Sequence, residues 1–486
     1  MKFERAKAVR GFKWTTASSL FVLATSPLLL LVQARFLSPE EFAVIAIISF
    51  IIGLIKVFEG TGVNQGVIVK EQVDTAEASS LFIFNLFLTM LPAGILFLLS
   101  GPIAASLGFV HLDYYLKLLC LVVLLHGPSN FYRAFLEKFF LFKQIAAVTI
   151  IRHALLLVST TVFLFMGLGV LGVIYGQIVS ITAATLLLVF WGVQHKVTEL
   201  KFIFSLNKLR FFLKFGVFTS GQGIITYVSR RVDELIIVYI LGPEIMGIYY
   251  FGKNLLEQLI QLSQKAFEKI LLPSFATLKN EREKLFRAYN KLTYFLAMVF
   301  FPVLIGISLT AHLFVPVIFG AQWEGSIIVI QVISVAIILK LLTDALAVNL
   351  LYSFNKPDTV FYMEVTTSAV YVLFLFLLAP LGILAVIITY SAFLIIKSLA
   401  LQYVTQRHLK STLSHYFSNM KGAVSFSLAM AAAVLGFQYA LSVWTNELLL
   451  LVASITVGAL VYTSLTLIYD KSGVKSFYKL MKSKEA

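Results

Sequence analysis

The chain alternates long apolar stretches with short loops whose Lys and Arg content switches on and off. Fourteen such stretches follow one another, each close to the roughly 20 residues that a helix needs to cross a bilayer. Every second loop is basic: eight segments hold 29 of the 39 Lys and Arg residues, whereas the intervening turns hold only Arg35. Because short loops rich in Lys and Arg stay in the cytoplasm, we expect fourteen crossings with both termini cytoplasmic.

Composition indicates the same class of protein. With 59% hydrophobic and 13% charged residues, 486 residues carry too little polar surface to coat a soluble globule. The net charge of +15 is spread over eight loops rather than gathered on one face, so we expect no nucleic-acid partner. The single cysteine, Cys120, excludes an intramolecular disulfide and a cysteine metal cluster. We therefore predict an all-α integral membrane protein.

A short internal repeat divides the predicted helices into two sets. The turn at Leu37–Ile45 reads LSPEEFAVI and the turn at Leu241–Tyr249 reads LGPEIMGIY, 204 residues later. That offset equals six helices and their loops. We expect two six-helix lobes, 1–200 and 201–405, followed by a helix pair and a basic cytoplasmic tail in 406–486. Repeats of this kind are common in transporters, where substrate binds between them.

Several charged residues lie inside the predicted spans, where each costs about 2.5 to 3.5 kcal/mol. Most occur as opposite charges three or four positions apart, which places acid and base on one face of a helix. These pairs are Lys56–Glu59, Arg230–Asp233, Arg231–Glu234, Lys253–Glu257 and Lys340–Asp344. In one interpretation each pair neutralises itself so that its helix inserts; in the other, the pairs line a water-filled cavity. Both interpretations stay open.

Bases exceed acids within the spans, which suits an anionic cargo such as a phosphate or pyrophosphate. Arg152 has no acid one turn away and is expected to face the cavity, whereas Lys397 is expected to extend toward a membrane surface. The cavity candidates for substrate binding are Arg230, Arg231, Lys253, Lys340, Lys56 and Arg152. The candidates for coupling to a proton or a sodium ion are Asp233, Glu257, Asp344 and Glu59.

Enzyme motifs are largely missing. Gly247–Lys253 matches the first seven positions of a phosphate-binding loop, but Asn254 replaces the required Ser or Thr and no strand precedes it. The seven histidines lack close metal-ligand spacing, and the longest outside loop, 310–325, has no Lys or Arg. We expect no catalytic residue, no metal and no cofactor.

The segment Arg230–Ile237, followed by Leu241–Tyr249, resembles the signature of the polysaccharide transport family. These are the O-antigen and exopolysaccharide flippases, of Wzx type, within the multidrug/oligosaccharidyl-lipid/polysaccharide exporter superfamily. Further matching motifs follow in order: Leu271–Phe275, Phe319–Trp323 and Asn355–Pro357. The chain departs from the family pattern at Phe251, where a small residue is usual, and at Asn355, where Gly is common.

The resemblance implies a flippase of the bacterial inner membrane that moves an undecaprenyl-pyrophosphate-linked oligosaccharide outward by alternating access. It also implies membrane lipids, a glycan polymerase and glycosyltransferases as partners in lipopolysaccharide or exopolysaccharide biosynthesis. A multidrug or cation antiporter of the same fold is the main alternative. A membrane glycan polymerase or ligase is a second alternative, which the short outside loops disfavour.

Overall fold

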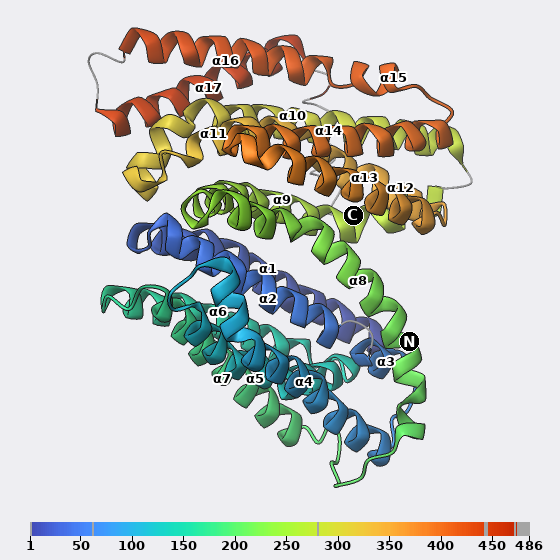
Figure 1. The fold of residues 1–486 in the computed structure, drawn as a ribbon. Helices are drawn as coiled ribbons and strands as arrows, with labels where there is room; N and C mark the ends of the chain where they lie inside the picture. The colour runs from blue at the N-terminus through green and yellow to red at the C-terminus, as the bar shows by residue number, and fades with distance from the viewer. Residues whose placement is uncertain (1, 61–62, 279–280, 442–445, 471–472, 474–486) are drawn as a thin grey trace. The chain divides into compact units, whose positions relative to one another are not determined.

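The computed structural model describes residues 2–60, 63–278, 281–441, 446–470 and 473. Within these residues the regular structure is entirely helical and contains no strand, so the all-α prediction is confirmed. Figure 1 shows long helices joined by short connections. The longest, α8 and α9, each have 36 residues.

The helices of the first half are α1 (Lys2–Phe36), α2 (Pro39–Gly60), α3 (Val63–Val69), α4 (Thr75–Leu107), α5 (Leu112–Lys138), α6 (Phe142–Phe165), α7 (Gly169–Gln194) and α8 (Leu206–Leu241). The second half contains α9 (Pro243–Leu278), α10 (Arg282–Phe314), η1 (Val315–Phe319), η2 (Ala321–Trp323), α11 (Ser326–Leu342), η3 (Thr343–Val348), α12 (Asn349–Ser353), α13 (Pro357–Leu378), η4 (Ala379–Leu381), α14 (Ile383–His408), α15 (Leu413–Ser418), α16 (Lys421–Leu441) and α17 (Glu447–Tyr469).

Eleven helical segments in the described part of the chain are long and apolar enough to cross a membrane. Each presents large apolar side chains outward, among them Leu98 of α4 at 77% exposure and Leu460 of α17 at 62%. Such surfaces need lipid as their solvent, so the protein is a multi-pass membrane protein. The remaining long helices, α2, α8 and α9, carry most of the predicted charge pairs. The count of fourteen crossings therefore stays a prediction.

The chain divides into two compact units, Met1–Gly247 and Ile248–Ala486. In the first unit α6 packs along both α7 and α1, and α4 packs along α5 (Figure 1). Helix α2 is well enclosed in its described part, where Phe42, Ala43 and Ala46 are fully buried. It contacts α4, α5, α7 and α8.

Two contacts fix α8 within the first unit. The Tyr227 hydroxyl donates to the carbonyl oxygens of Ser49 and Phe50 in α2, at 3.1 Å each. Near the start of α8, the Lys208 ammonium lies 2.6 Å from the Asp74 carboxylate. Asp74 also caps α4: its side chain accepts from the Glu77 amide at 2.7 Å, and Glu77 accepts in return from the Asp74 amide at 3.2 Å.

In the second unit α10 packs along α11, α16 and α17, while α14 packs along α11 and α13 (Figure 1). Its core includes Trp323, which is fully buried and stacks on Phe251 of α9 with ring centroids 4.2 Å apart. The lobes predicted from the repeat, 1–200 and 201–405, are defined by symmetry rather than by compactness. Those lobes and the separate segment 406–486 stay a prediction.

Candidate functional site

Arg230, Arg231, Asp233 and Glu234 lie together in the second half of α8. Arg231 lies one turn before Glu234, and its Nη1 donates to the Glu234 Oε1 at 2.8 Å. The Arg231 side chain is 21% exposed and that of Glu234 only 2%. The neighbouring Asp233 is 1% exposed, whereas Arg230 lies at the surface of the described chain. The predicted Arg231–Glu234 pair is thus confirmed as a largely buried ion pair, which needs further hydrogen bonds to offset desolvation.

In the first unit, His126 of α5 is deeply buried, with 6% of its surface exposed. The positive charges of Lys56 in α2 and Arg152 in α6 both act on its imidazole ring. The fold therefore brings two of the predicted cavity bases within electrostatic range of one side chain, although they are 96 positions apart in the chain. The side chain of Glu59, the expected partner of Lys56, lies outside the described residues.

Lys253 of α9 is deeply buried in the second unit, with 1% of its surface exposed. Its ammonium group lies 5.6 Å from the centre of the Tyr249 ring and 5.2 Å from that of Tyr390 in α14. Cation–π contacts of this kind compensate part of the lost hydration of an ammonium group. Glu257, one turn further along α9, is half-buried. Its pairing with Lys253 stays a prediction.

Lys340 and Asp344 are both half-buried, but the helix changes type between them. Lys340 belongs to α11, whereas Asp344 is the second residue of the π-helical segment η3. A π-helix has more residues per turn than an α-helix, so a spacing of four no longer places two side chains directly above one another. Short π-helical segments within α-helices are frequent at functional sites. The pairing of Lys340 with Asp344 also stays a prediction.

The expectation for Lys397 is wrong. Its ammonium group pairs with the Glu364 carboxylate at 2.5 Å, and both side chains are only 12% exposed. Glu364 belongs to α13 and Lys397 to α14, so the pair joins two helices. A search for acids one turn away on the same helix cannot find such a partner. For the same reason the sequence pattern does not indicate His126 or Tyr390, because each lies on a different helix from the bases near it.

The described residues contain no group of three His, Cys, Asp or Glu side chains arranged to hold a metal ion. What they contain instead is two sets of intramembrane charges: one in α2, α5, α6 and α8 of the first unit, the other in α9, α11, α13 and α14 of the second. Helical bundles that carry charges inside the membrane are typical of transporters, in which such charges line substrate or ion pathways.

Known structures define the class of fold. The chain superposes on the inward closed conformation of the lipid II flippase MurJ with a TM-score of 0.73, covering 96% of this chain and 100% of that one at 14% identity. It superposes on an inward-facing multidrug resistance MATE family transporter of the MOP superfamily with a TM-score of 0.67, covering 80% and 94% at 16% identity. The protein thus has the fold of these membrane transporters.

Sequence comparison then defines the family. Residues 32–328 match the family model of polysaccharide biosynthesis proteins, and the chain belongs to that family. It is 25% identical over 370 residues to the lipopolysaccharide biosynthesis protein WzxC of Escherichia coli, covering 76% of this chain and 74% of WzxC. It is 22% identical to the teichuronic acid biosynthesis protein TuaB of Bacillus subtilis, covering 93% of each chain. The succinoglycan biosynthesis transport protein ExoT of Rhizobium meliloti is 23% identical, with 65% and 64% covered.

Proposed function

We propose that this protein is a flippase that moves an undecaprenyl-pyrophosphate-linked oligosaccharide from the cytoplasmic to the outer leaflet of the bacterial inner membrane. The observation that carries the proposal is membership of the polysaccharide biosynthesis family on a transporter fold. One relative is named as a succinoglycan biosynthesis transport protein and one structural neighbour as a lipid II flippase. Transport rather than catalysis is the proposed activity, with both termini in the cytoplasm.

The intramembrane bases support an anionic cargo. Lys56 and Arg152 both lie within electrostatic range of His126, and the Arg231 side chain is 21% exposed although it pairs with Glu234. A guanidinium presents five N–H donors in a planar fork, so one edge can hold a carboxylate while another binds phosphate oxygens. Alternating access between two lobes would carry the pyrophosphate across while the lipid tail stays in the bilayer.

The same proposal assigns the driving force and the partners. Buried carboxylates such as Asp233 are the groups through which a proton or a sodium ion would couple to transport. Glu257 and Asp344 are the corresponding candidates in the second unit. Lipid-linked oligosaccharide is made by glycosyltransferases and consumed by a polymerase, so these enzymes are the expected functional partners.

Arg231 offers a test that separates cargo binding from simple neutralisation. We expect Arg231→Gln to impair glycan export while the protein stays in the membrane, and Arg231→Lys to retain more export because it keeps the charge. Loss of one charged hydrogen bond, about 1.5 to 3 kcal/mol, weakens cargo binding roughly ten-fold to more than a hundred-fold. The measurement is surface glycan in a strain whose own transporter is deleted, with protein quantified by immunoblot.

Two further variants complete the design. Arg287→Gln removes the same charge from a side chain that is 73% exposed, and it should leave export unchanged. The double change Arg231→Leu with Glu234→Leu removes the pair as a unit. If the pair serves only to neutralise itself, the double variant exports normally, and that result would refute a role of Arg231 in cargo binding.

A multidrug or cation antiporter remains the second candidate, because a MATE transporter shares the fold. The two functions differ in cargo charge. An antiporter would lower the susceptibility of a host strain to cationic drugs without restoring surface glycan, whereas the proposed flippase would do the reverse. A glycan polymerase or ligase is less favoured, because the described outside connections are short.

A further inference from the structure

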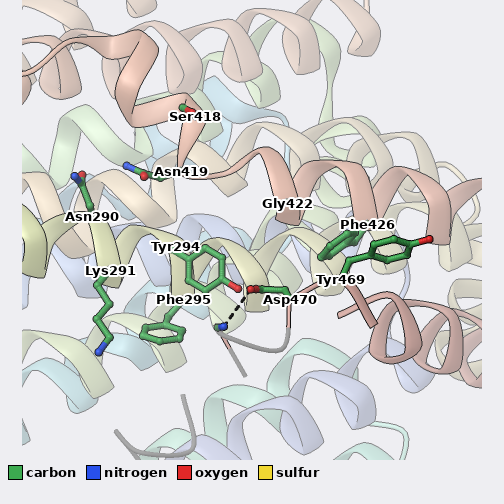
Figure 2. Close-up of a pocket in the computed structure, with 11 residues that line it drawn as sticks. Asn290, Lys291, Tyr294, Phe295, Ser418, Asn419, Gly422, Phe426, Tyr469 and Asp470 are labelled. Carbon is green, nitrogen blue, oxygen red and sulfur yellow. Dashed lines mark hydrogen bonds between the residues drawn. The ribbon is translucent and has the colours of Figure 1, made fainter. Parts of the chain in front are cut away.

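A pocket of about 740 Å³ lies at one end of α10, α16 and α17 (Figure 2). It is formed by the third and fourth turns of α10, by the junction of α15 with α16, and by the end of α17. All three positions fall on the side of the membrane that the basic loops predict to be cytoplasmic. Its polar and aromatic lining includes Asn290, Lys291, Tyr294, Asn419, Phe426 and Asp470.

The pocket combines one positive and one negative side chain. Lys291 is exposed and lies 5.8 Å from the centre of the Phe295 ring, while Asp470 is half-buried. Figure 2 shows the hydroxyl group of Tyr294 pointing toward the Asp470 carboxylate. A ligand that complements both charges has an anionic group and a cationic group of its own. A purely anionic ligand would meet the carboxylate at a cost.

Two amide side chains add unsatisfied hydrogen-bonding atoms. The Asn290 Oδ1 and the Asn419 Nδ2 are buried and have no hydrogen-bond partner among the described residues. Buried polar atoms of this kind are normally paired with protein, water or ligand. One is an acceptor and the other a donor, and both are covered by protein, so a ligand in the pocket reaches them only when the two side chains rotate toward it.

An apolar groove of about 570 Å³ follows the same three helices toward the other side of the membrane. Its lining includes Val303, Ile307, Val434, Leu451 and Tyr462. Tyr462 joins the groove to the pocket: its ring lies 6.4 Å from that of Phe426, and its hydroxyl donates to the Met298 carbonyl at 2.8 Å. The polar pocket thus lies near one end of α10, α16 and α17, and the apolar groove lies further along the same three helices.

We propose that this site binds one phospholipid of the cytoplasmic leaflet that has a phosphate and a primary ammonium in its headgroup, as in phosphatidylethanolamine. The phosphate lies by Lys291, the ammonium donates to Asp470, and the acyl chains follow the groove between α10, α16 and α17. The amides of Asn290 and Asn419 bind the polar backbone of the lipid. This proposal does not depend on the cargo, since a lipid at this site would support any transporter of this fold.

Lipid retention by the purified full-length protein tests the proposal. The probes are dioleoyl phosphatidylethanolamine, phosphatidylcholine and phosphatidylglycerol, each titrated in detergent and followed by native mass spectrometry and by the midpoint of thermal unfolding. We expect phosphatidylethanolamine to bind about ten-fold more tightly than either of the others. Phosphatidylcholine lacks an N–H donor for Asp470, and phosphatidylglycerol lacks the cation.

Substitutions of Asp470 and Lys291 test which part of the lipid headgroup each charge binds. Asp470→Asn keeps the oxygen that accepts from the Gly473 amide at 3.1 Å, and it should reduce phosphatidylethanolamine binding to the level of phosphatidylcholine. Lys291→Gln should weaken all three lipids about ten-fold. Glu283→Gln and Lys284→Gln are matched controls on α10, at side chains 93% and 62% exposed, and should change nothing.

Three outcomes would overturn the proposal. The first is phosphatidylglycerol binding as tightly as phosphatidylethanolamine. The second is a preference for phosphatidylethanolamine that stays unchanged in Asp470→Asn, or that the two control variants reduce as much as Asp470→Asn does. The third is displacement of the bound lipid by undecaprenyl phosphate at lower concentration, because the site would then serve the cargo lipid. Soluble glycerophosphoethanolamine should fail to bind at these concentrations, which separates a lipid site from a site for the free headgroup.

Discussion

At the scale of single residues, the sequence located the charges but not their surroundings. Lys253 stands out as a base in an apolar stretch, yet only the fold shows its ammonium between the rings of Tyr249 and Tyr390. Lys397 looked isolated and proved to be paired with Glu364. An acid and a base on the same helix can be matched by spacing, whereas partners on different helices depend on tertiary packing.

Gly247 shows how one position without a side chain can matter. An added Cβ would lie 1.7 Å from the Pro39 carbonyl oxygen, so the two turns of the internal repeat touch at this glycine. Because the nearest atoms are backbone, they cannot rotate away as a side chain could. Gly247→Ala is expected to destabilise the protein by about 1 to 3 kcal/mol or more, lowering its thermal unfolding midpoint.

Gly94 provides the matched control for that substitution. It lies inside α4, and an added Cβ there meets nothing within 4 Å. Gly94→Ala should leave the unfolding midpoint of the purified protein unchanged or slightly raised, since Ala is the better helix former. Equal midpoints for Gly247→Ala and the parent protein would contradict the close contact with Pro39.

At the scale of helices, length and class follow from local sequence, but special geometry does not. The apolar stretches become the predicted helices, since backbone groups inside a bilayer must be satisfied within the segment. The π-helical turn at Thr343–Val348 has no such local cause, and it changes the register between Lys340 and Asp344. The start of a helix, by contrast, can have a local cause in the sequence, as the capping box of Asp74 and Glu77 at the start of α4 shows.

Asp74 carries two functions that different substitutions separate. Asn can still cap α4 but cannot form the ion pair with Lys208, whereas Ala can do neither. We expect Asp74→Ala to lower the thermal unfolding midpoint more than Asp74→Asn. Asp113→Asn is a control, since that carboxylate pairs with Lys117 at 3.3 Å within one helix and at the surface.

The same residue predicts a dependence on pH. The Lys208 ammonium and the Glu77 amide hold the pKa of Asp74 below its ordinary value of 3.8. A carboxylate whose pKa is lower in the folded protein stabilises the fold at any pH above its ordinary pKa. This stabilisation is lost as the pH falls through the lower pKa that the group has in the folded protein. Between neutral pH and strongly acidic pH, the parent protein should therefore lose more stability than Asp74→Asn. Parallel curves for the two proteins would contradict this.

At the scale of the whole molecule, orientation rests on the distribution of basic residues. We expect Val110, which is 85% exposed after α4, to face outward and Glu283, at the start of α10, to face the cytoplasm. Single cysteines at these positions, in a Cys120→Ala background, test this with a membrane-impermeant thiol reagent on intact cells. Val110→Cys should react and Glu283→Cys should not. The reverse pattern would overturn the topology.

Cys120 is a suitable residue to replace for that experiment. It is buried in α5 and its thiol lies 3.3 Å from the Ala93 carbonyl, so it should react little with the reagent even when present. Permeabilised cells provide the positive control, in which both introduced cysteines become labelled. At the scale of the whole molecule, the two-lobe symmetry implied by the turns at Leu37–Ile45 and Leu241–Tyr249 also stays a prediction.

The sequence by itself determined the class of this protein, because a bilayer permits few solutions. Apolar stretches of membrane-spanning length must become helices, and the basic loops between them predict their direction. The order of the motifs around Arg230–Tyr249 likewise indicated the family. Within the first of these motifs, Arg231 and Glu234 form an ion pair. Only the tertiary structure decided which charges meet. Lys397 pairs with Glu364, and Lys56 and Arg152 lie within electrostatic range of His126, because packing brings together helices whose order along the chain does not specify their neighbours.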